Sequence, residues 1–191
     1  MLTNILLDKL PQITQNGLEI DTDFRTSIKF ELLMQDNKIF EKDKILLALN
    51  LYYDLSKIKD INIAIKDMLW FYRCGRDEKK ELVSSENNDN RSNQIYSYQF
   101  DADYIFDAFL EQYQINLNKV KCLHWWEFKA MFNGLNENTQ ISKIMGYRAI
   151  DLSKIKDKET KNHYKKLRKL YALPDVRTTE EKERDFGSVF W

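Results

Sequence analysis

Apolar side chains recur every three or four residues along most of this 191-residue chain, which is the spacing of helices that bury one face. Only five glycines and two prolines interrupt the pattern, as is typical of long helical segments. Divided at its breaks, the pattern predicts about six helices. The sequence therefore predicts a mainly α, compact multi-helix fold with one small N-terminal β-hairpin.

The densest apolar stretch spans residues 96–152 and forms the centre of the predicted fold. Its first helix would begin at a cap formed by Asp101 or Asp103, where a carboxylate meets the free N–H groups of the first turn. Its second helix, over 120–132, is apolar on nearly every side, so we expect other elements to cover it. Gly134 would end this helix in the left-handed conformation.

The predicted core of this stretch is aromatic and includes one arginine. It consists of Phe109, Leu123, Trp125, Trp126, Phe128, Tyr147 and Arg148. Arg148 follows Tyr147 on a helix with apolar neighbours, so we expect its guanidinium to be partly buried and paired with a carboxylate. The two adjacent tryptophans have no interleaved basic residues, which favours packing in the core over stacking on nucleic-acid bases.

The N-terminal part of the chain predicts a hairpin followed by a small helical layer. The dipeptide Asn16-Gly17 stands between apolar residues and is a strong signal for a two-residue turn. Residues 12–20 are therefore predicted to form the hairpin. Asp21 or Thr22 would then cap the first helix.

Two further helices complete this layer. A helix over 42–53 is expected to turn one apolar face toward the core, formed by Ile45, Leu46, Leu49, Tyr52 and Tyr53. The next begins at Asp60 and is predicted to stop at Gly75, again in the left-handed conformation.

Residues 77–97 break the helical pattern. They combine charged residues with clustered Ser and Asn and offer almost nothing to bury, which predicts a mobile loop. The chain is accordingly divided into a hairpin and helical layer over 1–76, an aromatic-rich helical core over 98–174, and an acidic tail with an apolar end over 175–191. The loop either separates two units or decorates a single domain, and the sequence is compatible with both.

The last predicted helix, over 153–173, is strongly basic in a chain whose 30 basic and 30 acidic residues cancel. Within residues 153–171, eight basic side chains stand against two acidic ones. Three interpretations stay open: a solvated face, a surface for an acidic or helical partner, and a contact to nucleic acid. The neutral net charge disfavours nucleic acid. We predict that Lys165, Lys166 and Lys169 bind a partner.

The acidic tail ends in the apolar residues Phe190 and Trp191. An apolar end of this kind needs a surface to cover it, either its own core or another chain. We therefore include Phe190 and Trp191 among the predicted partner-binding residues.

No segment carries a catalytic or cofactor motif. Phosphate loops of the GxxxxGK[ST] type, HExxH and GxSxG do not occur, so we predict no enzyme activity, no metal and no cofactor. Cys122, His124 and Glu127 resemble a metal-ligand set, but their place in an aromatic helix favours structural roles. Cys74 and Cys122 have no metal-finger spacing and are predicted to be reduced thiols, with one disulfide as the alternative.

The first residues lack the basic and apolar regions of an export signal, and no stretch approaches the length of a membrane span. Together with the two cysteines that are predicted to be reduced thiols, this pattern predicts a soluble protein of the cytoplasm.

Several short blocks resemble a known phage family. They are LP (10–11), NG (16–17), IDTDFR (20–25), FLEQY (109–113), LHWWEF (123–128), NGL (133–135), IMGYR (144–148) and YALP (171–174). Together they resemble the phage gene-product-fifteen family of Gram-positive phages and prophages, over about residues 7–174. Gln114 departs from the family pattern because a glycine turn is expected there, and the polar 77–97 connection is a second departure.

This resemblance implies a tail-assembly chaperone, encoded near the tape-measure gene and acting in the host bacterial cytoplasm. Its expected partners are the tape-measure protein and an upstream tail-assembly protein, and neither membrane nor nucleic acid is expected. Two alternatives are a structural tail or virion component, and a nucleic-acid-binding phage regulator.

Overall fold

The structure, a computed structural model, describes residues 4–76 and 94–174. Within these ranges it contains seven α-helices, one short 3-10 helix and no β-strand. In chain order the elements are α1 (Phe24–Gln35), α2 (Glu41–Tyr52), η1 (Leu55–Lys57), α3 (Ile61–Tyr72), α4 (Ala102–Tyr113), α5 (Trp125–Asn133), α6 (Gln140–Ala149) and α7 (Lys158–Leu170). The mainly α fold is confirmed, whereas the predicted count of about six helices is too low by one for the described residues.

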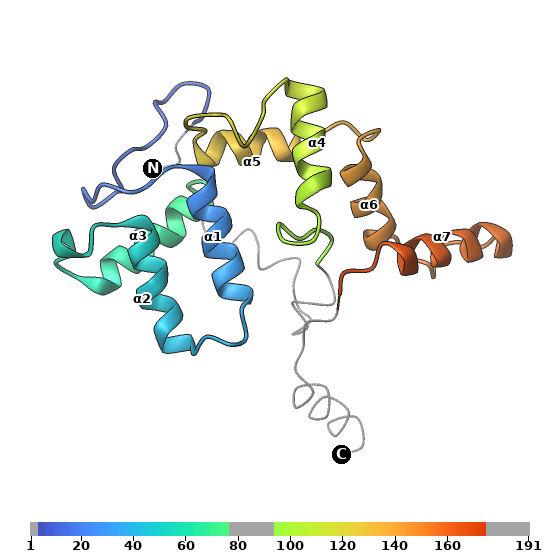
Figure 1. The fold of residues 1–191 in the computed structure, drawn as a ribbon, viewed down its shortest axis with the longest axis horizontal. Coiled ribbons are helices and arrows are strands. Elements are labelled where there is room, and N and C mark those ends of the chain that lie inside the picture. Colours follow the sequence, from blue (N-terminus) through green and yellow to red (C-terminus); the bar gives the residue numbers. More distant parts are fainter. Residues whose placement is uncertain (1–3, 77–93, 175–191) are drawn as a thin grey trace, which may run out of the picture.

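The main contacts between helices form one series, α3–α2–α1–α5–α4–α6–α7. Helices α1, α2 and α3 lie on one side of the molecule, α4 and α6 lie on the other, and α5 lies between the two groups (Figure 1). Helix α7 contacts α6 and extends away from the other helices (Figure 1). The two groups of helices therefore meet through α5.

The predicted N-terminal β-hairpin is wrong. The chain does reverse direction at Asn16 and Gly17, and Gly17 has the left-handed φ of +82° that suits a tight turn. The two arms, however, share an isolated bridge between Ile13 and Glu19 and form no strands. A lone two-stranded ribbon is only marginally stable in water, so this segment needs another support.

That support is a buried carboxylate of α3. The side-chain amide of Asn16 donates to one oxygen of Asp67 at 2.7 Å, and the hydroxyl of Thr14 donates to the other. The backbone N–H of Asn16 also donates to Asp67, at 3.3 Å. Docking on α3 thus satisfies the polar groups of the turn and takes the place of strand pairing.

Carboxylates begin two helices of the N-terminal layer. The Asp23 side chain accepts the backbone N–H of Arg25 at 2.9 Å and caps α1, so the predicted cap at Asp21 or Thr22 is wrong. Asp60 caps α3 as predicted. The sequence pattern reveals that a capping carboxylate is present, while the choice between neighbouring candidates depends on the path of the backbone.

The face of α2 that meets the core agrees only in part with the prediction, because Leu49, Tyr52 and Tyr53 are buried as expected and Ile45 and Leu46 are not. Ile45 and Leu46, expected to point inward, are 48% and 58% exposed. Lys44 points inward instead, and its ammonium donates to the Met34 carbonyl at 3.0 Å and to the Glu41 carboxylate at 2.8 Å. A buried ammonium needs such acceptors, so these bonds hold α2 in an orientation that leaves Ile45 and Leu46 on the surface.

The central helix is shorter than predicted. Helix α5 begins at Trp125 with His124 as its N-cap, so residues 120–123 lie outside it. Gly134, which follows α5, has a φ of −93° and is not left-handed, contrary to the prediction. The left-handed residue is Gln114, with a φ of +56° at the end of α4, at the position where the family resemblance expects a glycine.

Trp125 and Trp126 join α5 to the end of α3. The indole N–H of Trp125 donates to the Tyr72 carbonyl, and that of Trp126 donates to the Phe71 carbonyl, both at 2.8 Å. The last carbonyls of a helix lack partners within the helix, and the buried indoles donate to them: the Tyr72 carbonyl accepts from Trp125, and the Phe71 carbonyl accepts from Trp126 in addition to the backbone N–H of Cys74 at 2.9 Å. The chain leaves α3 through Gly75, which is left-handed as predicted, with a φ of +73°.

Phe128 of α5 lies at the centre of the core. Its ring stacks against Phe24 of α1 and Phe109 of α4, with both centroid distances at 4.9 Å, and so contacts both groups of helices. Among the described residues, the largest fully buried apolar side chains are Trp125, Tyr52, Phe71, Phe109, Phe128, Leu49, Ile141 and Ile144.

A buried ion pair between Asp101 and Arg148 joins α4 and α6. The guanidinium donates to both carboxylate oxygens, at 2.6 and 2.9 Å, and the two side chains are only 2% and 9% exposed. It also donates to the Ile95 carbonyl at 3.0 Å and to the Tyr171 carbonyl at 2.7 Å. The predicted role of Asp101 as a side-chain cap of α4 is wrong, because its carboxylate bonds to Arg148 and to the Ser97 N–H instead.

Truncating the Trp126 side chain tests how much it contributes to the free energy of unfolding. We expect Trp126→Ala to lower the free energy of unfolding by roughly 3–5 kcal/mol, because it removes a large buried ring. Trp126→Phe keeps a ring in the core while removing the N–H donor, and should cost less. Urea unfolding followed by circular dichroism measures both variants. Equal stability of Trp126→Ala and the unaltered protein would contradict this assignment.

The ion pair is tested by removing one partner at a time. Arg148→Met leaves the Asp101 carboxylate buried without its cation, and we expect a loss of about 3–5 kcal/mol in the free energy of unfolding. Arg148→Lys keeps the charge but not the planar fork of donors, so we expect an intermediate loss. In the double variant Asp101→Asn, Arg148→Met, the loss should be smaller than the sum of the single losses. Additive losses in urea titrations would show that the two groups do not act as a pair.

Candidate functional site

The three lysines singled out in the sequence, Lys165, Lys166 and Lys169, are exposed on α7. No residue of α7 is buried, and the helix contacts α6 through Tyr147, whose ring lies 5.8 Å from that of Tyr171 and 6.3 Å from that of Tyr164, measured between centroids. Helix α7 is thus a basic element with most of its surface open to solvent.

Other predicted features fall outside the described residues. These are Phe190 and Trp191 at the end of the chain and residues 77–93 of the predicted loop. The predicted core residues Phe109, Leu123, Trp125, Trp126 and Phe128 are buried, Tyr147 is partly buried, and the side chain of Arg148 is 9% exposed.

His124 and Glu127 form a capping box at the start of α5. The Nδ1 atom of His124 accepts the backbone N–H of Trp126 at 3.1 Å, and the Glu127 carboxylate accepts the backbone N–H of His124 at 3.2 Å. Both side chains are therefore used by the helix, and no group of three potential metal ligands lies within residues 4–76 and 94–174. No disulfide joins Cys74 and Cys122.

The second ring nitrogen of His124 fixes its tautomer. Because Nδ1 accepts a hydrogen bond, Nε2 carries the proton, and it lies 3.1 Å from the Pro11 carbonyl to which it donates. Burial lowers the pKa of His124 below its ordinary value of 6.5, and the Pro11 carbonyl and the Glu127 carboxylate oppose this only in part. The neutral imidazole therefore holds the N-terminal segment against α5.

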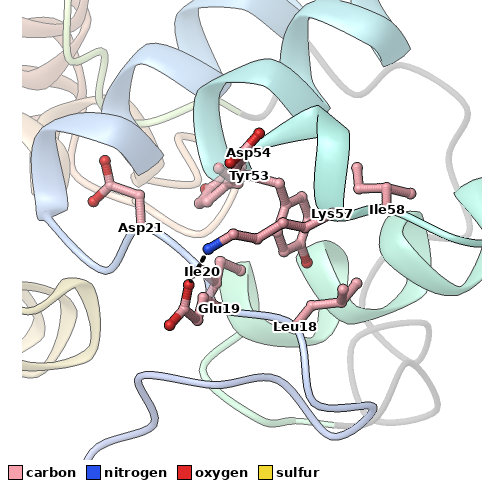
Figure 2. A pocket seen from close by; sticks show the side chains of 9 residues that line it. Leu18, Glu19, Ile20, Asp21, Tyr53, Asp54, Lys57 and Ile58 are labelled. Carbon is pink, nitrogen blue, oxygen red and sulfur yellow. Dashed lines mark hydrogen bonds and ion pairs between the residues drawn. The ribbon is translucent and has the colours of Figure 1, made fainter.

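A pocket of about 260 Å³ lies between the segment before α1 and the end of α2. Figure 2 shows Glu19 and Lys57 facing each other across it, joined by an ion pair of 2.7 Å. Asp21 and Asp54 also line this pocket, but each carboxylate accepts local hydrogen bonds, from Thr26 and Ser56 respectively. No histidine or cysteine is among the residues that line the pocket, and its aspartates are engaged in these local hydrogen bonds.

A second concavity, of about 390 Å³, is an apolar groove between α1 and α2. It is lined by Lys29, Leu32, Leu33, Asp36, Leu47, Asn50 and Leu51. Ile45 and Leu46 are exposed on the same helix α2, and Phe40, which precedes it, is 80% exposed. This part of the molecule therefore offers more apolar surface than a solvated helix pair needs.

Such a groove suits an amphipathic helix. Four leucines provide contacts for apolar side chains at helical spacing, and Lys29 and Asp36 offer opposite charges that orient a bound segment. The run Ile45-Leu46-Leu47 is continuous and covers more than one helix face, so the sequence pattern alone did not reveal which face would stay on the surface.

Comparisons with known proteins give one match. A family model described as "Bacteriophage Gp15 protein" matches residues 6–173. No curated protein and no solved structure matches the chain. None of the helices in the described ranges combines the length and the hydropathy that crossing a bilayer would require.

The position of His124 predicts a pH dependence of stability. Its folded-state pKa lies below that of the unfolded chain, so the unfolded state binds the proton first as the pH falls below about 6.5. We expect the free energy of unfolding to decrease there, by at most about 1.4 kcal/mol per pH unit.

His124→Asn is the matched control, since asparagine also caps helices but does not titrate. Burial raises the pKa of Glu31, which opposes this trend, but that contribution is common to both proteins and cancels in their difference. Urea unfolding of both proteins at several pH values between about 5 and 7.5, a range that includes the ordinary pKa of histidine, measures the difference in their free energies of unfolding. Identical pH profiles would contradict a neutral buried His124.

Proposed function

Because the chain belongs to the bacteriophage Gp15 protein family, we propose that it is a tail-assembly chaperone that binds the tape-measure protein during tail morphogenesis. Membership of this family suggests a structural or virion-related role in a phage. The observation that supports the finer proposal is the apolar groove between α1 and α2, which is open to a partner.

The physical task of such a chaperone is to cover apolar helical surface until another protein replaces it. A tape-measure chain presents long helices before the tail tube forms around it, and exposed apolar surface of that kind aggregates. Binding alone keeps the bound chain in solution by mass action. The proposed role therefore needs no catalysis and no cofactor, and its place is the cytoplasm of the host bacterium.

The groove supplies the contacts that this role needs. An apolar helix face of the client would pack against Leu32, Leu33 and Leu47, while its flanking polar residues would meet Lys29 and Asp36 at the rim. Because the groove is lined by helices α1 and α2, the client-binding surface would lie at the opposite end of the helix series from α7. An upstream tail-assembly protein is the second partner that this proposal includes.

The groove is tested by placing a charge inside it. Leu47 lines the groove and its neighbour Leu46 does not, although both are exposed on α2. When the chain is coexpressed with the tape-measure protein of the same phage, we expect the two to copurify. Leu47→Glu should weaken this binding at least about tenfold, or ~1.4 kcal/mol, because a carboxylate would be desolvated at the contact. Leu46→Glu carries the same charge and should bind as the unaltered protein does.

Three readouts decide the result: the soluble fraction of the tape-measure protein, the amount that copurifies, and the content of purified virions. Equal binding by Leu47→Glu and Leu46→Glu would show that the tape-measure protein does not contact the groove. A chain that does not bind the tape-measure protein and is present at stoichiometric levels in virions would be a structural tail component. Salt-sensitive binding to DNA in place of the tape-measure protein would favour a regulator.

A further inference from the structure

Helix α7 carries a stripe of lysines with no partner among the described residues. Lys161, Lys165 and Lys169 follow each other at intervals of four, so they lie on one face of the helix, and all three are exposed. Within residues 4–76 and 94–174, no carboxylate lies within ion-pair distance of them. Like charges at this spacing repel each other, so a helix that keeps them gains from an external negative partner.

Helix α4 carries the complementary stripe. Asp103, Asp107 and Glu111 also follow each other at intervals of four, and all three are exposed. Helix α4 contains no lysine or arginine, and its three carboxylates have no ion pair within the part of the chain that the structure describes. The acidic stripe therefore has the same number and spacing of charges as the basic stripe.

The two stripes do not neutralise each other within one molecule. Helix α6 contacts both α4 and α7, whereas α4 and α7 share no main contact. Figure 1 shows α7 directed away from α4, with α6 between them. A second copy of the chain, by contrast, brings a free acidic stripe of the right spacing to every free basic stripe.

We propose that α7 of one copy docks on α4 of another copy. The three matched charges on each helix are separated by two intervals of four residues, which extend about 12 Å at the helical rise of 1.5 Å per residue. Tyr104 and Leu110 flank the acidic stripe and are more than a third exposed, so apolar contact with α4 accompanies the ion pairs. Ion pairs on a surface are individually weak, and the association is therefore salt-dependent.

The two surfaces that meet are different, so two copies can exchange both contacts about a twofold axis, or each copy can use its two stripes for two different neighbours. In the second case the assembly either closes into a ring or extends as a chain. The α1–α2 groove takes no part in it. This inference is independent of the proposed chaperone role, and a failure of one leaves the other standing.

The first test is the oligomeric state of the full chain. Sedimentation velocity at about 0.01 M salt, where the Debye length is roughly 30 Å, should show species larger than a monomer. At about 1 M salt, where the Debye length is roughly 3 Å, the same sample should be monomeric. A monomer at low salt and high protein concentration, or an oligomer that salt does not dissociate, would overturn the proposal.

Charge reversal then assigns the two surfaces. We expect Lys161→Glu, Lys165→Glu to be monomeric at low salt, and Asp107→Lys, Glu111→Lys to be monomeric as well. Asp103 stays unchanged because its carboxylate stabilises the start of α4. Circular dichroism confirms that each variant is folded.

Mixing the two reversed variants is the decisive measurement. Each then offers the other a complementary surface, so the mixture should associate although neither component does. The matched control is Lys42→Glu, Lys59→Glu, which makes the same charge change at exposed lysines outside α7 and should associate as the unaltered protein does. A mixture that stays monomeric, or a control that also dissociates, would show that α7 and α4 do not meet. Loss of association in the α7 variant alone, with nucleic acid bound by the unaltered chain, would assign α7 to that ligand instead.

Discussion

Two neighbouring indole N–H groups bond to the last carbonyls of α3, and through this contact the two groups of helices become one structure. Trp125 and Trp126 begin α5, so the same residues start one helix and complete the end of another. The rings of both tryptophans are buried, and on the same helix the ring of Phe128 lies between those of Phe24 and Phe109. His124 caps α5 and, through its other nitrogen, holds the chain at Pro11. Residues 124–128 therefore provide both the buried hydrogen bonds and the apolar packing that join the two groups of helices.

Arg148 has a comparable role in the C-terminal part. Its guanidinium bonds to the Asp101 carboxylate and to the carbonyls of Ile95 and Tyr171, and so connects α6 to the start of α4, to the segment before it and to the end of α7. Burying two charges is costly, and good geometry with additional acceptors offsets that cost. These bonds hold the C-terminal end of α7 at Tyr171, while no residue within α7 is buried.

The fold thus separates structural from interacting parts. The interior of the helix series holds the aromatic rings and the buried ion pair, while its two ends present surface that no other described element covers. Near one end, next to α3, lies the apolar groove of α1 and α2, which we propose for a helical client. The other end is the basic α7, which we propose to meet α4 of a second copy. Self-association by charge at one end would bring several apolar grooves into one assembly, and such multivalency raises the effective concentration of binding sites along an extended client.

Periodicity, capping residues and turn glycines are local properties, and from them the sequence determined the helical class of this protein, the start of α3 at Asp60 and the left-handed Gly75 shortly after this helix. The family likewise followed from blocks of residues read in order. Contacts between distant segments decided the rest. Asp67 holds the N-terminal turn in place of a strand partner. The hydrogen bond from Lys44 to the Met34 carbonyl at the end of α1 turns Lys44 inward, which leaves Ile45 and Leu46 exposed. Asp101 lies next to a helix start in sequence, yet it bonds to Arg148, because a buried guanidinium attracts a carboxylate more strongly than the N–H groups of a helix end do. The groove and the charged stripes depend on the same choices, since a surface is whatever tertiary packing leaves uncovered.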